Sequence, residues 1–219
     1  MTLNFRLLVF VFFAVSINIY SQVYESIEKT AAQYFVNLST KDSKSDDDLL
    51  KLKEMLFRNY DKAELESKYE VSINNFDSLK NNFNKYESTI KNISKDSALV
   101  LFNQWYLHLS NTFYKYANEK FFSSSKTKIL FFSASMSCYC TLEMCKKRTI
   151  EILNLAKEMN LDYWIVDSYE HNDLQIKYET LFAPSVILFD KSNNVINKIE
   201  YDENLLPKLS EIIKTKLKG

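Results

Sequence analysis

The chain has 219 residues, 46% of them apolar and 15% aromatic, a composition that supports a substantial core and excludes global disorder. Acidic and basic residues balance at 28 each, which removes the electrostatic argument for nucleic acid as a partner. The single glycine is Gly219, so nucleotide binding through a glycine-rich phosphate loop or a dinucleotide fingerprint is excluded.

Residues 1–21 predict a cleavable signal peptide. An apolar stretch from Leu7 to Ile19 follows Arg6, and Ser21 is a small residue before Gln22, where a signal peptidase can cut. The stretch is shorter than the ~20 apolar residues that span a bilayer, and an uncleaved anchor is the alternative. We therefore expect a mature chain that is periplasmic or secreted, in a compartment where disulfides persist.

Residues 22–122 predict an all-helical N-terminal region, because apolar residues recur there at steps of three and four. We expect aspartates within residues 39–46 to cap the second helix, and Ser94 or Ser97 to cap a later one. The apolar stripes either dock a partner helix or pack on one another and on the next domain, and we favour packing. The stripes include Ile27, Ala31, Tyr34, Phe35 and Leu38, then Phe76, Leu79, Phe83, Tyr86 and Ile90, then Leu101, Phe102, Trp105, Leu109, Phe113 and Tyr116.

Residues 126–219 predict an α/β domain in the order β-α-β-α-β-β-α. It follows a short polar joint at residues 123–126. Pro207 is compatible with the last helix only in its first turn. The strands are expected at residues 128–133, 163–167, 185–189 and 195–201, and the helices at residues 141–159, 173–178 and 203–217.

The run Ser137-Cys138-Tyr139-Cys140 lies where the first strand of this domain leads into its first helix. Backbone N–H groups and the helix dipole stabilise a thiolate at such a position, and the thiolate is the reactive form of cysteine. Three cysteines are an odd number, so a purely structural disulfide framework does not explain them. The pattern therefore predicts thiol chemistry at the start of this helix.

Three segments in residues 126–219 resemble the thioredoxin superfamily. They are the strand end Phe-Phe-Ser-Ala-Ser before the cysteines, the run Ile176-Lys-Tyr178, and Ala183-Pro184 leading an apolar strand. The resemblance implies a thioredoxin-like domain preceded by an all-helical region, and a cis peptide bond before Pro184. It also implies a groove in which Pro184 lies against the thiols and Ala183 offers backbone groups to an extended polypeptide, with no organic cofactor.

The family's usual Trp-Cys-x-x-Cys motif is not kept. An ungapped alignment places Met136 at the tryptophan, Ser137 at the first, nucleophilic cysteine and Cys140 at the second, resolving cysteine. Cys138 falls between them, and Phe131 replaces the buried acid that assists proton transfer in the family. The fold assignment survives these changes, but standard reductase activity does not follow from it.

Three functions remain open, and thiol–disulfide exchange on protein substrates is the one we favour. Cys138 would attack and Cys140 would resolve the mixed disulfide, with Ser137 and Tyr139 as accessory residues. A Cys-x-Cys disulfide closes a small ring that should be strained, and strained disulfides are the more oxidising ones. Such a site suits an oxidant or an isomerase, and the sequence does not identify its redox partner.

The second function is a redox-inactive module that binds extended polypeptide beside Pro184, and the replacements at Ser137 and Phe131 favour it. The third function is soft-metal binding, since thiolates and thioethers favour Cu(I). Its candidate ligands are Met136, Cys138, Cys140 and Cys145.

Cys145 shares the apolar face of its helix with Leu142 and Ile152, so we expect it to be buried. A reactive Cys145 would pair with Cys140 or rescue a mixed disulfide, although a five-residue separation on a helix is poor for a direct bridge. Residues 167–171, after the second strand, are interpreted as an ordinary surface loop.

Overall fold

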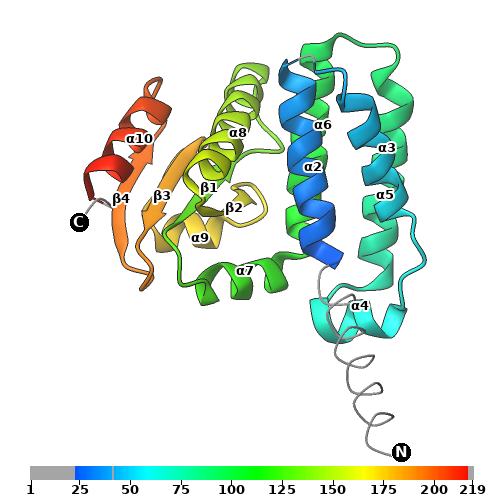
Figure 1. Ribbon diagram of the computed structural model, residues 1–219, viewed down its shortest axis with the longest axis horizontal. Coiled ribbons are helices and arrows are strands. Elements are labelled where there is room, and N and C mark those ends of the chain that lie inside the picture. Colours follow the sequence, from blue (N-terminus) through cyan, green and yellow to red (C-terminus); the bar gives the residue numbers. More distant parts are fainter. Residues whose placement is uncertain (1–22, 41, 217–219) are drawn as a thin grey trace, which may run out of the picture.

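The computed structural model describes residues 23–40 and 42–216, which form a helical region followed by an α/β region (Figure 1). The predicted signal peptide at residues 1–21 lies outside these residues. Within the described ranges, no helix is both long enough and apolar enough to cross a membrane.

The described part of the N-terminal region is helical, as the sequence predicts. Helices α2, α3, α5 and α6 stand side by side, and α7 leads away from them to the sheet (Figure 1). The helices are α2 Val23–Thr40, α3 Ser45–Leu56, α4 Lys62–Tyr69, α5 Ile73–Ile90, α6 Lys95–Thr112 and α7 Tyr114–Ser123.

The ends of these helices were predicted only in part. Ser94 caps α6 by accepting from the backbone N–H of Ser97, as expected. The predicted aspartate cap of α3 is wrong, because its N-cap is Lys44 and Asp46 lies inside the first turn. There its carboxylate is placed favourably for the helix dipole instead. The short helix α4, capped by Asp61, was not predicted.

The long stripe expected from Leu101 to Tyr116 belongs to two helices, because α6 ends at Thr112 and α7 begins at Tyr114. Phe113 between them is fully buried, with φ −103° and ψ 23° outside the helical region. The break turns the chain, so that Phe121 of α7 reaches Trp164 and Phe189 of the sheet.

The α/β region has the predicted order β-α-β-α-β-β-α. Its mixed sheet has the strand order β2-β1-β3-β4, in which β1 runs parallel to β2 and antiparallel to β3, and β3 pairs antiparallel with β4. The elements are β1 Lys128–Ser133, α8 Tyr139–Met159, β2 Asp162–Asp167, α9 Asn172–Lys177, β3 Ser185–Phe189, β4 Val195–Glu200 and α10 Leu205–Lys216. Pro207 falls in the first turn of α10, as required.

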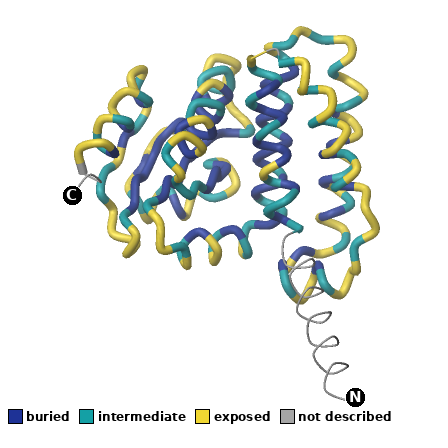
Figure 2. The backbone as a smooth tube through the Cα atoms, in the orientation of Figure 1, coloured by how far each residue is buried: buried dark blue, intermediate teal, exposed yellow. Residues whose placement is uncertain are grey.

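The central strands β1 and β3 are buried along their whole length, so both faces of the sheet are covered (Figure 2). Because both faces are buried, the sequences of these two strands are continuous apolar runs, without an alternation of apolar and polar residues. Helix α8 packs on β1 and β2 and also contacts α10, which packs on β4. The edge strand β4 is more exposed and ends the sheet on the side away from the helical region (Figures 1 and 2).

The helical region packs directly on the sheet, as predicted, and a single hydrophobic core runs through both. Helix α6 lies along the edge strand β2, where the buried hydroxyl of Ser110 donates to the carbonyl of Ile165 at 2.6 Å. The same hydroxyl accepts from Trp164 Nε1 at 3.2 Å. An unpaired strand edge invites association with other chains, and α6 covers this one.

A second polar contact links α2 to its neighbour α6 and to strand β2 of the sheet. The Glu28 carboxylate accepts hydrogen bonds from Tyr106 of α6 and, at 2.6 Å, from Tyr163 of β2. Burial raises the pKa of Glu28, although the two tyrosine hydroxyls act in the opposite direction. One turn earlier, Glu25 pairs with Lys120 at 2.8 Å.

We expect Ser110→Ala to lower the free energy of unfolding by about 2–3 kcal/mol, because it leaves a buried carbonyl and the Trp164 N–H without partners. Urea denaturation followed by tryptophan fluorescence measures the loss. Ser88→Ala is the control, since its exposed hydroxyl bonds only to Lys85 O in its own helix, and its cost should stay below about 0.5 kcal/mol. Equal costs for the two variants would contradict the role of Ser110.

Glu28→Gln and Glu25→Gln should change stability with opposite pH dependence. The raised pKa of Glu28 gives stability that is present below its unfolded pKa and is lost as pH rises through its folded pKa. Burial also disfavours the Glu25 carboxylate, but hydrogen bonds from Lys120 and Tyr116 outweigh it and lower the pKa. Stability from Glu25 is therefore lost as pH falls.

Chemical denaturation from about pH 4 to about pH 8 brackets the ordinary glutamate pKa and separates the two cases. The wild-type-minus-variant free energy of unfolding should fall with rising pH for Glu28→Gln and should rise for Glu25→Gln. Slopes of the same sign would show that the two carboxylates do not differ as the structure indicates.

Candidate functional site

The cysteine loop, residues 134–138, connects the carboxyl end of β1 to the start of α8. Cys138 is the N-cap residue of α8, with extended φ −62° and ψ 153°, and its carbonyl accepts the Leu142 N–H at 3.1 Å. Cys140 lies in the first turn of the same helix. The predicted placement of both thiols at a helix N-terminus is therefore confirmed.

Cys138 and Cys140 are exposed free thiols whose sulfur atoms lie 2.6 Å apart. The Cys138 sulfur also lies 3.2 Å from the hydroxyl of Thr141. The hydrogen bond from Cys140 lowers the pKa of Cys138 most, Thr141 lowers it further, and the resulting value is about 7. A substantial fraction of Cys138 is then thiolate at neutral pH, which is the condition for attack on a disulfide.

Cys145 is fully buried, as predicted, one turn further along α8. Burial raises the pKa of its thiol to about 11, although the nearby Ala134 backbone and Ser133 hydroxyl act against it. A buried thiol with a high pKa is inert, so Cys145 is a core residue.

Ser135, in the middle of the cysteine loop, makes two hydrogen bonds to residues outside the loop. Its backbone N–H donates to the Asp167 carboxylate at 3.2 Å, and its carbonyl accepts from Gln104 Nε2 at 2.8 Å. Asp167 also accepts from the N–H of Tyr169 at 3.0 Å, which ties the cysteine loop to the loop after β2. The interpretation of residues 167–171 as an ordinary surface loop is wrong for Asp167, since only 1% of it is exposed.

A buried hydrogen-bond network supports the start of the same loop. Asn103 of α6 donates to Ser133 at 3.3 Å and accepts from Thr149 of α8 at 2.8 Å, and Thr149 also bonds to the Cys145 carbonyl at 2.9 Å. Sequence reasoning missed Asn103, Gln104 and Asp167 as site residues. The available signal was the polar pair Asn103-Gln104, which interrupts the run of apolar residues from Ala98 to Leu107 in the middle of α6.

The peptide bond between Ala183 and Pro184 is cis, as predicted. Ala183 lines an open groove of about 630 Å³ beside the cysteine loop, together with Met136, Ser137 and Thr141. Pro184 itself is buried and does not line the groove, and its carbonyl accepts the Tyr201 N–H at 3.0 Å. The structure therefore brings the predicted substrate-binding residue Ala183 to the same groove as Ser137.

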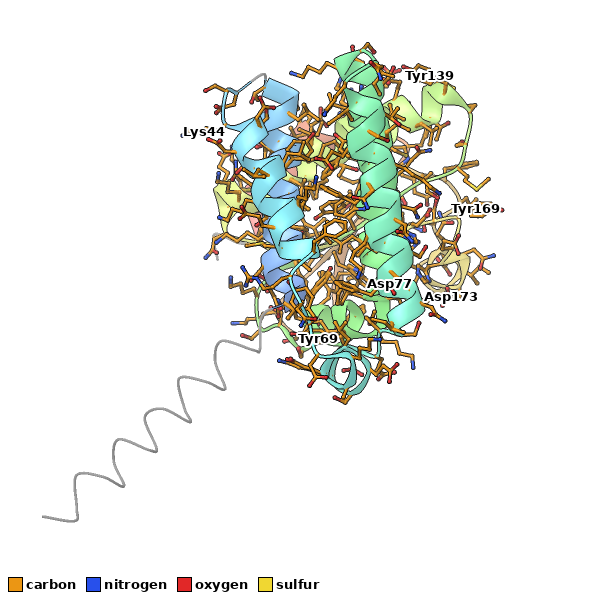
Figure 3. The ribbon with its side chains drawn as sticks, turned by 90° about the vertical axis from the view of Figure 1, so that its right-hand side faces the viewer. Lys44, Tyr69, Asp77, Tyr139, Tyr169 and Asp173 are labelled. Carbon is orange, nitrogen blue, oxygen red and sulfur yellow. The ribbon has the colours of Figure 1, made fainter. Side chains whose placement is uncertain are left out.

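The groove is rimmed by large apolar side chains that are exposed to solvent. Among these, Tyr169 projects outward, and Tyr139 at the start of α8, which does not line the groove, is exposed as well (Figure 3). Several large apolar side chains exposed around one groove are a feature of binding sites. The exposed residues that line the groove are Met136, Tyr169, Leu181, Phe182 and Tyr201.

The candidate metal ligands are not all brought together: Cys138 and Cys140 are adjacent, but Cys145 is set apart from them. Cys145 is buried, whereas Met136, Cys138 and Cys140 are exposed. Among the described residues, no group of three or more His, Cys, Asp and Glu side chains is arranged to hold a metal ion. The three cysteines therefore do not form one ligand set.

Comparisons with known proteins give little additional information. No protein-family model matches the sequence, and no curated protein matches it. One solved structure, described as a crystal structure of a designed protein, aligns with 47% of this chain and 86% of its own at 14% identity, with a TM-score of 0.38. A similarity this low supports no inference about fold or function.

Alkylation of Cys138 by iodoacetamide should follow a titration curve with a midpoint at about pH 7. Cys140→Ala should move this midpoint upward most, and Thr141→Val less, toward the ordinary thiol value of about 8.5. Tyr139→Phe is the control, since the phenol does not contribute to the shift. Peptide mass spectrometry resolves the three cysteines, and an unchanged midpoint in Cys140→Ala would refute the proposed origin of the low pKa.

Proposed function

We propose that this chain is an extracytoplasmic, thioredoxin-like protein that performs thiol–disulfide exchange on protein substrates through Cys138 and Cys140. The observation that carries the proposal is the pair of exposed sulfurs 2.6 Å apart at a helix N-terminus, one of them with a lowered pKa. The mixed sheet, its interleaved helices and the cis bond before Pro184 support the thioredoxin-like assignment.

The exchange begins when the Cys138 thiolate attacks one sulfur of a substrate disulfide. The Cys138–substrate bond forms, the substrate S–S bond breaks, and the released substrate thiolate takes up a proton. Cys140, after losing its proton, then attacks the Cys138 sulfur and releases the second substrate thiol. Two electrons and two protons pass to the substrate, and the Cys138–Cys140 disulfide forms.

The reverse direction oxidises a substrate dithiol and regenerates the two thiols. A disulfide between residues only two apart closes a small ring, whose strain favours its reduction. We therefore expect the site to act as an oxidant or an isomerase more readily than as a strong reductant. Cys138 at the N-cap and Cys140 in the first turn of α8 already have adjacent sulfurs, so the reaction needs no large movement of the fold.

The groove beside the loop would bind the polypeptide around the reacting cysteine. It is an open groove of about 630 Å³, and Ala183 lines its wall. The exposed Phe182 and Tyr169 offer apolar contact to substrate side chains on either side. Such contacts are sequence-tolerant, which suits a protein that acts on many substrates.

A redox-inactive polypeptide-binding module is the second candidate. Ser137 stands at the family's nucleophile position and is exposed, and Phe131 stands at the position of the buried acid and is fully buried in β1. The same groove would then bind an extended chain without covalent chemistry. The two functions differ in one respect, namely whether Cys138 and Cys140 exchange with a dithiol.

Equilibration of the purified protein in glutathione redox buffers, followed by alkylation and mass spectrometry, tests the proposal. We expect a reversible Cys138–Cys140 disulfide and exchange with a model peptide dithiol. Cys138→Ser should slow the exchange at least about a hundredfold, as expected for loss of a nucleophile. Cys140→Ser should instead accumulate the mixed disulfide, because the resolving thiol is missing.

Cys145→Ser is the matched control, since its thiol is buried and should leave exchange unchanged. Thiols that stay unpaired in every buffer would refute the exchange function. Binding of an unfolded polypeptide that persists in the Cys138→Ser, Cys140→Ser double variant, together with absent exchange, would establish the second candidate.

A further inference from the structure

A second cavity lies where the helical and α/β regions meet, away from the cysteine loop. Its volume is about 540 Å³, and it shares no lining residue with the groove beside Ala183. Residues of α2 form one wall, and residues of α7, α8 and β2 form the others. Its apolar lining includes Ala32, Val36, Ala117, Phe121, Leu153 and Ala156.

The size and lining of this cavity are those of a small-molecule site. Such sites occupy about 300–1,000 Å³, are mostly apolar, and occur preferentially between domains. The three alanines leave room where larger side chains would have closed the contact between α2, α7 and α8. An apolar body of a ligand would fill this space.

The acidic groups of the cavity wall already have partners in the wall itself. Glu28 accepts from two tyrosine hydroxyls, and Glu25 pairs with Lys120 at 2.8 Å and accepts from Tyr116 at 2.6 Å. The remaining oxygen of Glu25 is buried and has no hydrogen-bond partner among the described residues. Asp162 pairs with Lys126 at 3.3 Å. These carboxylates are therefore poorly placed to attract a cation.

Two lysines of the cavity wall form no salt bridge with a carboxylate of the described residues. Lys29 on α2 and Lys157 on α8 are both exposed, so they stand on facing walls at the solvent side of the cavity. Lys157 makes a 3.5 Å hydrogen bond to Gln33 across the gap. Among the residues that the structure describes, neither Lys29 nor Lys157 forms a salt bridge.

We propose that this cavity binds an amphipathic anion, with its apolar body among the alanines and its anionic head between Lys29 and Lys157. A medium-chain carboxylate such as decanoate has this chemistry. The proposal is independent of the thiol–disulfide function, because the two sites share no residue.

Alanine-methyl NMR of the purified protein, labelled with ¹³C at alanine methyl groups, tests the site directly. Titration with decanoate should perturb the methyl signals of Ala32, Ala117 and Ala156 saturably. Ala134 and Ala183, which line the groove beside the cysteine loop, should not respond. Decyltrimethylammonium, an amphipathic cation of the same chain length, should bind more weakly than decanoate.

Lys29→Gln and Lys157→Gln should each weaken decanoate binding about threefold, the size expected of an exposed charge contact. Lys51→Gln is the matched control, because Lys51 is an exposed lysine on α3 that does not line the cavity. Val36→Trp should abolish binding by filling the cavity, and the dispersion of the remaining methyl signals shows whether that variant is folded.

Two outcomes would overturn the proposal. The first is that decanoate does not perturb the cavity alanines, whether or not Ala134 and Ala183 respond. The second is equal or tighter binding of the cation. A loss of thiol exchange in Cys138→Ser leaves these signals unaffected, so failure of one function is distinguishable from failure of the other.

Discussion

Helix α6 shares a buried boundary with β2 and α8, and the position of the cysteine loop depends on that boundary. Two adjacent polar residues of α6 act at this boundary: Asn103 bonds to the end of β1, and Gln104 to the loop that follows it. Without them, the buried polar groups they satisfy would cost free energy and the loop would lose its support. The helical region is therefore part of the site's construction, although it contributes no thiol.

The same boundary also covers the open edge of the sheet at β2. A parallel edge strand such as β2 is usually covered on both faces and at its open side, because its backbone groups otherwise remain unpaired. Helix α6 covers β2 through Ser110, and α7 adds Phe121 against Trp164. A cavity remains between α2 and α8 because small side chains line the inner turns of both helices there. The shape of the second candidate site is thus a consequence of how the two regions meet.

The sequence was sufficient to predict those strands and helices that are determined by their own residues. Strands β1 and β3 have the predicted bounds because each is an apolar run ended by polar residues. Prediction failed where contacts with distant residues determine whether a helix forms or a side chain is buried. Helix α4 has a weakly patterned sequence that depends on burial of Leu65 and Tyr69, and Asp167 is buried because Ser135 and Tyr169 supply its donors. The cysteines were found because their chemistry is local, whereas the residues that support them come from another region.

The helix start determines which residue can act as the nucleophile more directly than an alignment does. In the proposed alignment with the thioredoxin superfamily, Ser137 takes the place of the first cysteine, but it lies two residues before the start of α8. Cys138 occupies the N-cap itself, where the Cys140 and Thr141 side chains lower its pKa to about 7. Cys140 is two residues further on, so the backbone of a single helical turn fixes the separation of the two sulfurs. The first cysteine stands at position 138 and not at the aligned position 137, and this shift keeps a thiol at the helix start. Its main consequence is that a disulfide with Cys140 would close a smaller ring.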